Sequence, residues 1–255
     1  MLRKHLLVLS ALLATHFGVL PARAEAIHVA VAANFAEPMK RIKAQFEKGS
    51  QHTVLTSVGA TGTFYAQIKS GAPFQVLLSA DDETPVRLEK EGHAVAGSRF
   101  TYAIGKLALW SAREGVVDAR GEVLRRGGFE HIALANPRLA PYGTAAVETM
   151  KALGVYDPLS RKIVQGENIA QTFQFISTGN TLLGFIALSQ ITSEDGKRKP
   201  GSVWIVPETL YAPIRQDAVL LDKGRSSAAS RALLTYLKSP EAQRIILAYG
   251  YALDK

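Results

Sequence analysis

Four places along the chain join an apolar run to a helical pattern through small residues and a hydrogen-bonding side chain. These junctions contain, in chain order, Asn34, Thr61, Tyr142 and the pair Asn168–Ile169. A helix begins with about four backbone N–H groups that have no intrahelical acceptor, and this end carries about half a unit of positive charge. Helix starts that converge on one point therefore predict an anion site that needs no lysine or arginine.

The residues around the junctions also predict how the helices begin. Asn34 with Glu37, and Asn168 with Gln171, have the three-residue spacing of a capping box. The glycines within 59–62 would let backbone N–H groups approach a ligand closely. Because most helices have caps, one junction carries little information, and it is the set of four that favours an anion-binding cleft.

Few residues are arranged for catalysis or metal binding. The sequence contains no G-x-S-x-G, P-loop, G-x-G-x-x-G or H-E-x-x-H motif. It has no cysteine, and its six histidines are not at metal-ligand spacing. The acidic run Asp81–Glu83 follows an apolar strand pattern, where carboxylates commonly complement a helix dipole. We therefore expect this run to be structural.

Strand-like and helix-like stretches alternate along the whole chain. Strands are expected over 27–31, 53–57, 74–79, 107–110, 132–135, 183–187, 203–206 and 218–221. Helices are expected over 38–46, 63–70, 84–91, 145–153, 169–178, 226–237 and 240–248. This alternation predicts an α/β fold with mainly parallel sheets and flanking helices. In such sheets ligands bind at the carboxyl ends of the strands, where the junctions fall.

The first 24 residues have the three parts of a secretory signal. A basic start at Arg3 and Lys4 precedes the apolar stretch Leu6–Leu20, and Ala22–Ala24 has the pattern of a cleavage site. Cleavage would remove three basic residues and no acidic one, so the net charge would fall from +8 to +5. We expect a periplasmic protein, and for such a protein we expect no nucleic-acid partner.

Five segments give the chain a resemblance to a known family: Val29–Phe35, Gly59–Gln67, Gly71–Asp81, Asn136–Gly143 and Tyr249–Tyr251. The chain resembles the periplasmic molybdate-binding proteins of ABC transporters over essentially its whole mature length. The resemblance implies a two-lobed type II periplasmic-binding-protein fold with a ligand cleft between the lobes. Lobe 1 would comprise residues 25–102 plus 214–255, and lobe 2 residues 103–213.

The resemblance also implies which residues hold the oxyanion. The ligand shell falls on Asn34, Thr61, Tyr142 and Ile169, the first two from lobe 1 and the last two from lobe 2. Many family members have a tyrosine donor where this chain has Ala187, and the Tyr142 hydroxyl is a candidate replacement. Some relatives also have a hydroxyl in place of Ala33.

These implications lead to one expected function and several alternatives. We expect a monomer that captures molybdate or tungstate, closes around it and docks on a membrane permease, without cofactor, metal-ion ligands or catalysis. The alternatives are a receptor for sulfate or a small carboxylate, an exported α/β hydrolase using Asp81 or Asp82, and the effector lobe of a transcriptional regulator. A carboxylate receptor would usually need an arginine fork, and we expect no arginine inside the four junctions.

Overall fold

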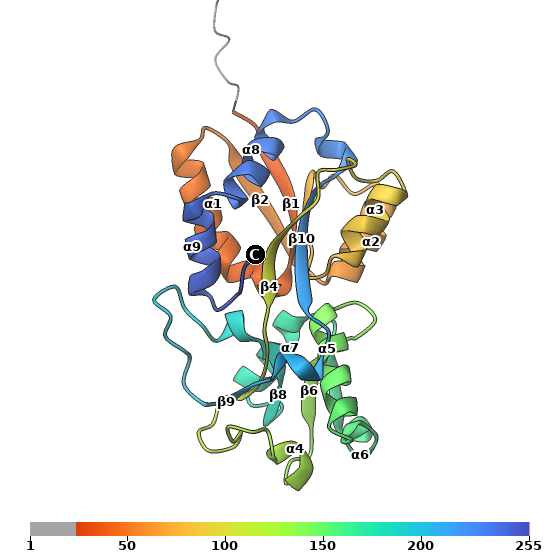
Figure 1. Ribbon diagram of the computed structural model, residues 1–255, viewed down its shortest axis with the longest axis vertical. Coiled ribbons are helices and arrows are strands. Elements are labelled where there is room, and N and C mark those ends of the chain that lie inside the picture. Colours follow the sequence, from red (N-terminus) through yellow and green to blue (C-terminus); the bar gives the residue numbers. More distant parts are fainter. Residues whose placement is uncertain (1–23, 255) are drawn as a thin grey trace, which may run out of the picture.

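The computed structural model describes residues 24–254, so the predicted signal sequence, apart from Ala24, lies outside the described residues. The chain forms two five-stranded sheets that lie end to end along the long axis of the molecule (Figure 1). The first sheet has the order β2-β1-β3-β10-β4, with strands Ala26–Ala32 (β1), Thr53–Gly59 (β2), Val76–Leu78 (β3), Phe100–Gly105 (β4) and Ile214–Leu220 (β10). The second has the order β7-β6-β8-β5-β9, with strands Leu107–Ser111 (β5), Ile132–Ala135 (β6), Ile163–Gly166 (β7), Leu183–Ala187 (β8) and Ser202–Ile205 (β9).

Both sheets are mixed. Strand β1 pairs in parallel with β2 and β3, and β6 pairs in parallel with β7 and β8. Strands β10 and β5 run antiparallel to both of their neighbours. The two-lobed α/β class predicted from the sequence is confirmed. The expectation of mainly parallel sheets is wrong, because two of the four strand pairings in each sheet are antiparallel. The antiparallel strands β5 and β10 are the first that the chain forms after it passes from one half to the other.

Helices cover both faces of each sheet (Figure 1). The α-helices are Ala36–Gly49 (α1), Thr61–Lys69 (α2), Glu83–Lys90 (α3), Val123–Arg126 (α4), Pro141–Ala152 (α5), Tyr156–Leu159 (α6), Ile169–Ser177 (α7), Ala228–Leu237 (α8) and Pro240–Ala248 (α9). Helices α1, α8 and α9 pack on one face of the first sheet, and α2 and α3 on the other. Helices α4, α5 and α6 pack on one face of the second sheet, with α7 on the other. No helix within 24–254 is long and apolar enough to cross a bilayer.

Short 3₁₀ turns connect several of these elements. They are Ala33–Phe35 (η1), Ser160–Lys162 (η2), Leu188–Gln190 (η3), Glu208–Leu210 (η4) and Asp222–Gly224 (η5). Of these, η1 follows β1 and η3 follows β8, so each extends a strand that ends between the two halves of the molecule.

Local sequence sets the helix boundaries as expected in α9 and less closely elsewhere. Ser239 caps α9 by accepting the Ala242 N–H at 3.3 Å, Pro240 occupies the first helical position, and Gly250 follows with a φ of +86°. Helix α5 begins at Pro141, four residues earlier than its apolar periodicity predicts. Strands β4 and β7 were not among the expected elements.

The chain passes between the two sheets at two connections. Only Lys106 separates the end of β4 from the start of β5, and residues 206–213 join β9 to β10. At the first connection Gly105 has no room for a side chain, because a Cβ atom there would lie 2.1 Å from the Tyr142 hydroxyl oxygen. The carboxyl ends of β1, β2, β6 and β7, where the four junctions lie, thus meet between the two halves.

Candidate functional site

A small cavity between the two halves brings the four junctions together. It is small, with about 10 Å³ open to the centre of a water-sized sphere, and is lined by backbone and side chains of Ala32, Ala33, Asn34, Gly59, Ala60, Thr61, Ala80, Ala140, Pro141, Tyr142, Asn168 and Ile169. None of these lining residues is charged. Asn34, Thr61, Tyr142 and Ile169, the four residues predicted to hold a ligand, all line it and are all at most 3% exposed.

The start of α7 leaves one backbone N–H group for the cavity. The Asn168 side chain accepts the N–H groups of Ala170 at 2.9 Å and of Gln171 at 3.0 Å, as the expected cap does. These are the second and third amides of α7, so the Ile169 N–H is left without a capping partner. The Ile169 carbonyl is held by Gln190 Nε2 at 2.9 Å, which fixes the orientation of that residue.

The start of α5 also leaves one backbone N–H group for the cavity. Pro141 occupies the first helical position and has no N–H, so Tyr142 supplies the first amide of the helix. The next amide, of Gly143, is already bonded to the Ala140 carbonyl at 2.8 Å. The Tyr142 N–H is therefore the amide of this turn that lines the cavity without an intrahelical acceptor.

The start of α2 supplies an amide and a hydroxyl. Thr61 is the first residue of the helix, and its amide has no acceptor one turn earlier. Its Oγ1 accepts the Ala80 N–H at 3.0 Å, while the Ser79 hydroxyl, 3.5 Å away, donates to the Asp81 carboxylate at 3.0 Å. Because Oγ1 takes part in the Ala80 bond as an acceptor, the Thr61 hydroxyl keeps a proton that it can donate to a ligand.

The capping role expected for Asn34 is wrong. Turn η1 separates β1 from α1, so the residue before α1 is Phe35 and no side chain caps the helix. The Asn34 amide nitrogen instead donates to Gln216 Oε1 at 2.8 Å and to the Tyr251 hydroxyl at 3.0 Å. Both side-chain hydrogens of Asn34 are thus used inside the protein, which leaves its backbone N–H as the group to meet a ligand.

A buried polar cluster supports the cavity from behind. Gln216 bonds to Asn34, donates to the Tyr142 hydroxyl at 3.1 Å, and accepts from Tyr102 at 3.1 Å. The Tyr251 hydroxyl donates to the Asn34 carbonyl at 2.8 Å and lies 3.0 Å from Ser189 Oγ. Burial raises the pKa values of Tyr102, Tyr142 and Tyr251 above the usual range, so the three phenols stay neutral.

This cluster was not predicted from the sequence. Tyr251 belongs to one of the family segments, but nothing local distinguishes Gln216, which lies within β10. The cluster also contains the Tyr142 hydroxyl. We expected this hydroxyl to replace the tyrosine donor that many family members have where this chain has Ala187. That hydroxyl accepts from Gln216 and lies against Gly105, while the Ala187 amide bonds to Gln190 Oε1 at 3.0 Å.

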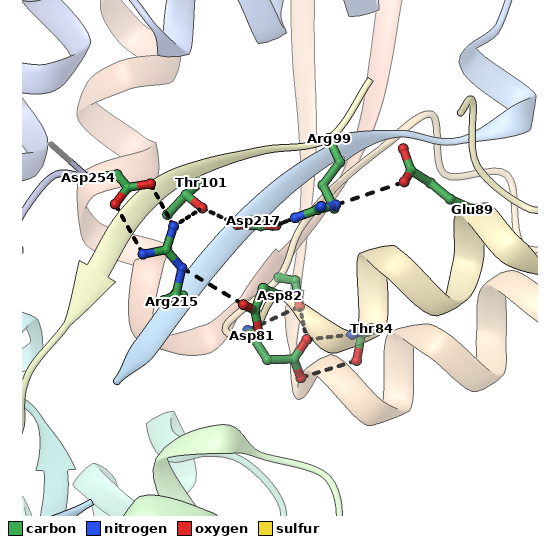
Figure 2. A network of polar contacts seen from close by, with 10 residues as sticks. Asp81, Asp82, Thr84, Glu89, Arg99, Thr101, Arg215, Asp217 and Asp254 are labelled. Atoms are coloured by element: carbon green, nitrogen blue, oxygen red, sulfur yellow. Dashed lines mark hydrogen bonds and ion pairs between the residues drawn. The ribbon is translucent and has the colours of Figure 1, made fainter. Parts of the chain in front are cut away.

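Full charges are gathered beside the cavity instead of in it. Figure 2 shows Arg99 paired with the fully buried carboxylate of Asp217, which also accepts the Thr101 hydroxyl at 2.7 Å. Arg215 binds both oxygens of Asp254, at 3.0 and 2.6 Å, and lies 3.8 Å from Asp82. The side chains of Arg99, Thr101, Arg215 and Asp217 all come from β4, β10 or the residue before β4, so this network ties together the two strands next to the connections.

The acidic run has the structural role that we expected. The Asp81 carboxylate accepts the Thr84 N–H at 2.9 Å and hydroxyl at 3.1 Å, at the start of α3 (Figure 2). Burial raises the pKa of Asp81, and the bonds from Ser79 and Thr84 partly oppose this effect. No group of three histidine, aspartate or glutamate residues between 24 and 254 is placed to hold a metal ion.

One arginine does lie within a junction, contrary to the expectation. Arg138 belongs to the segment Asn136–Gly143, where its N–H bonds to Asn136 Oδ1 at 3.0 Å. Its side chain is exposed and Arg138 is not among the cavity-lining residues, so it forms no arginine fork at this site. The cavity is lined by amides, one free hydroxyl and apolar groups, an arrangement suited to a small ligand that only accepts hydrogen bonds.

Two α/β halves with an uncharged, donor-lined cavity between them are the architecture of a solute receptor. Residues 27–252 match the family model described as bacterial extracellular solute-binding protein, and the chain belongs to this family.

The similar proteins with curated names agree with this assignment. The chain is 57% identical over 233 residues to the molybdate-binding protein ModA of Azotobacter vinelandii, covering 91% of this chain and 92% of that protein. It is 51% identical over 235 residues to ModA of Rhodobacter capsulatus, covering 92% and 91%. Among solved structures it superposes on the Azotobacter vinelandii periplasmic molybdate-binding protein with a TM-score of 0.87 and 42% identity, covering 90% of this chain and 100% of that one.

Proposed function

We propose that this protein is a periplasmic receptor that captures molybdate, and also tungstate, for import by an ABC transporter. The observation that carries the proposal is the cavity itself: helices α2, α5 and α7 start at it, and no charged residue lines it. The ligand would be held by the backbone N–H groups of Asn34, Thr61, Tyr142 and Ile169 and by the Thr61 hydroxyl. High identity to two proteins named for molybdate binding supports the choice of oxyanion.

The chemistry of the donors matches the ligand. Molybdate at neutral pH is a fully deprotonated tetrahedral dianion, so it accepts hydrogen bonds and donates none. A hydrogen bond to a charged group contributes about 1.5–3 kcal/mol, so five donors are enough for tight binding after the costs of association. Protonated phosphate or arsenate would leave a proton without an acceptor, because the lining residues bring no carboxylate.

The nearest alternative is a receptor for sulfate, which has the same charge on a smaller tetrahedron. The fold alone does not separate the two, since the chain also superposes on the sulfate-binding protein SubI of Mycobacterium tuberculosis with a TM-score of 0.75 at 14% identity. Selectivity then depends on the width of the cavity. A hydrolase using Asp81 or Asp82 is disfavoured, because the Asp81 carboxylate is bonded to Thr84 at the start of α3 and Asp82 lies 3.8 Å from Arg215.

The remaining features of the proposal concern the context in which the protein works. Residues 1–24 would direct export to the periplasm and be removed, and the mature protein would act as a monomer without cofactor or enzymatic activity. Because all of β4 pairs in the first sheet, lobe 1 would reach residue 105 instead of the expected 102, and lobe 2 would begin after Lys106. Closure about the two connections would deliver the ligand to a membrane permease.

A thermal-shift panel tests the function. A ligand that binds only the folded state raises the melting temperature, so micromolar molybdate or tungstate should raise it and equal sulfate should raise it much less. Equal shifts with sulfate would contradict the selectivity, and no shift with any of the three anions would contradict the function. Chloride at matched ionic strength is the control for general salt effects.

A further inference from the structure

One backbone hydrogen bond joins the two halves directly beside the cavity. The Gly62 N–H, the second amide of α2, donates to the Leu139 carbonyl at 2.9 Å. Gly62 follows Thr61, and Leu139 lies three residues before Tyr142, so the bond connects two segments that line the cavity from opposite halves. Figure 1 shows α2 and α5 on the same side of the molecule, one in each half.

The contact at Gly62 is too tight for a side chain unless its neighbour moves by a few tenths of an ångström. A Cβ atom there would lie 3.0 Å from Leu139 Cα, 3.2 Å from Cδ2 and 3.3 Å from the carbonyl oxygen. Gly62 is not among the residues with positive φ, so its backbone conformation is open to any residue. Glycine lowers the stability of a helix, and its presence at position 62 is therefore explained by the close approach of Leu139 from the other half.

Leu139 is held too firmly to move away from an added methyl group. It lies in a tight turn in which the Asn136 carbonyl accepts the N–H groups of Leu139 at 3.0 Å and of Ala140 at 2.8 Å. The Asn136 N–H is itself bonded to the Gly166 carbonyl, at the end of β7, at 2.7 Å. A side chain at position 62 would thus be accommodated by separating the two halves, since packed segments resist local displacement.

We propose that Gly62 is a positioning residue that sets how closely the two lobes approach, and that its hydrogen bond to Leu139 acts as a latch on the closed state. The latch fixes the spacing between Thr61 and Tyr142, and hence the width of the cavity. Its effect on affinity rests on the proposed oxyanion function, because a ligand held from both lobes binds in proportion to the closed fraction. Its effect on closure does not require a ligand.

The test compares Gly62→Ala with Gly49→Ala. Gly49 ends α1, has no positive φ, and a Cβ atom added there would meet no other atom within 4 Å, so it is the matched control. The chain has no cysteine, so Lys90→Cys in α3 and Ala152→Cys in α5, both exposed, allow a pair of spin labels across the two halves. Label distances are measured with and without molybdate, and affinities by titration.

We expect Gly62→Ala to shift the label distances toward larger separation and to weaken molybdate binding about tenfold, mainly through faster release. The melting temperature of the ligand-free protein should be unchanged or higher, because alanine favours the helix. Gly49→Ala should leave the label distances and the affinity unchanged.

Three outcomes decide whether Gly62 and Leu139 form a latch on the closed state. Label distances that are the same in Gly62→Ala and the parent protein overturn the latch. A melting temperature of ligand-free Gly62→Ala that falls by more than a few degrees also overturns it, because the methyl group would then disturb the first half itself. If the label distances shift but the parent protein responds to no oxyanion, the latch stands and the proposed function fails.

Discussion

The cavity and the charged network lie on neighbouring segments of the same chain, yet they use opposite chemistry. The cavity presents amides and a hydroxyl and is lined by no charged residue. The network on β4 and β10 pairs two arginines with Asp82, Glu89, Asp217 and Asp254, of which Asp217 is fully buried (Figure 2). The proposed binding site thus offers only fixed dipoles and a hydroxyl, whereas ion pairs hold two strands together.

The difference has a physical reason. A dianion bound to a buried arginine would compete with any carboxylate partner of that arginine. An arginine without such a partner would be an unpaired buried charge whenever the site was empty. Helix starts do not have this problem, because their partial charges are part of the backbone and lose little when the ligand leaves. Two kinds of variant therefore test the comparison: one introduces a charge into the cavity, and the other removes a charge from the network.

The largest effect is expected from introducing a charge into the cavity. Asn34→Asp replaces a buried amide with a carboxylate that repels the dianion and can no longer donate to Gln216 and Tyr251. We expect molybdate to bind about a hundredfold more weakly, measured by calorimetric titration at neutral pH. Asn180→Asp, the same change at an exposed position outside the cavity, is the control. Retained affinity in Asn34→Asp would contradict the requirement for an uncharged site.

The next effect is expected from removing a charge from the network. Asp217→Ala deletes the buried partner of Arg99 and the acceptor of the Thr101 hydroxyl. Breaking a buried pair costs about 3–5 kcal/mol, and we expect the lower end because the Arg99 side chain is 36% exposed and can regain water. The free energy of unfolding in urea measures this loss.

Asp195→Ala provides the comparison for the network. It breaks the exposed pair with Lys197 and should change the free energy of unfolding by less than about 0.5 kcal/mol. If Asp217→Ala and Asp195→Ala lowered the free energy of unfolding equally, the burial of Asp217 would not explain how the network stabilises the protein.

A smaller loss of molybdate affinity is expected from removing a hydroxyl group, and it should differ between Thr61 and Tyr142. Thr61→Val removes a hydroxyl at the start of α2 that can donate to the ligand and should weaken molybdate binding about tenfold or more. Tyr142→Phe should weaken it only about threefold, because the Tyr142 hydroxyl lies in the buried cluster, beside Gln216 and Gly105. Equal losses in the two variants would show that the Tyr142 hydroxyl contributes as much as Thr61, and no loss in Tyr142→Phe would remove it from the site altogether.

The smallest effect is expected from pH. No group lining the cavity titrates near neutrality, and burial raises the pKa of Tyr142, so its phenol keeps its proton as the pH rises. Molybdate affinity should therefore vary by less than about twofold between about pH 6 and about pH 9. Titrations across this interval check it, and a steep change would reveal an ionisable group acting on the ligand.

The sequence was most informative where a local pattern has a local cause. The cap by Asn168, the limits of α9 and the structural role of Asp81 follow from a few neighbouring residues, and all three are confirmed. The meeting of the four junctions was also anticipated, because the carboxyl ends of strands gather at one edge of a sheet. Their part in binding a ligand stays a prediction.

The sequence was least informative where a contact joins distant segments. Asn34 was expected to cap its own helix, and its partners Gln216 and Tyr251 are more than 180 residues away in the chain. The close contact of Gly62 with Leu139 likewise has no local signature, because a glycine near a helix start has several common causes. Strand β4 was not expected because its burial depends on pairing with β10.

The order of strands in the first sheet has a consequence for how the protein reaches its native state. Strand β10 lies between β3 and β4 but is more than a hundred residues later in the chain, whereas all five strands of the second sheet fall between residues 107 and 205. Non-local pairing slows folding, so we expect the second sheet to gain hydrogen-exchange protection first during refolding. Until β10 inserts, β3 has an unpaired edge and β4 has no strand partner, and this intermediate is where aggregation is most to be expected.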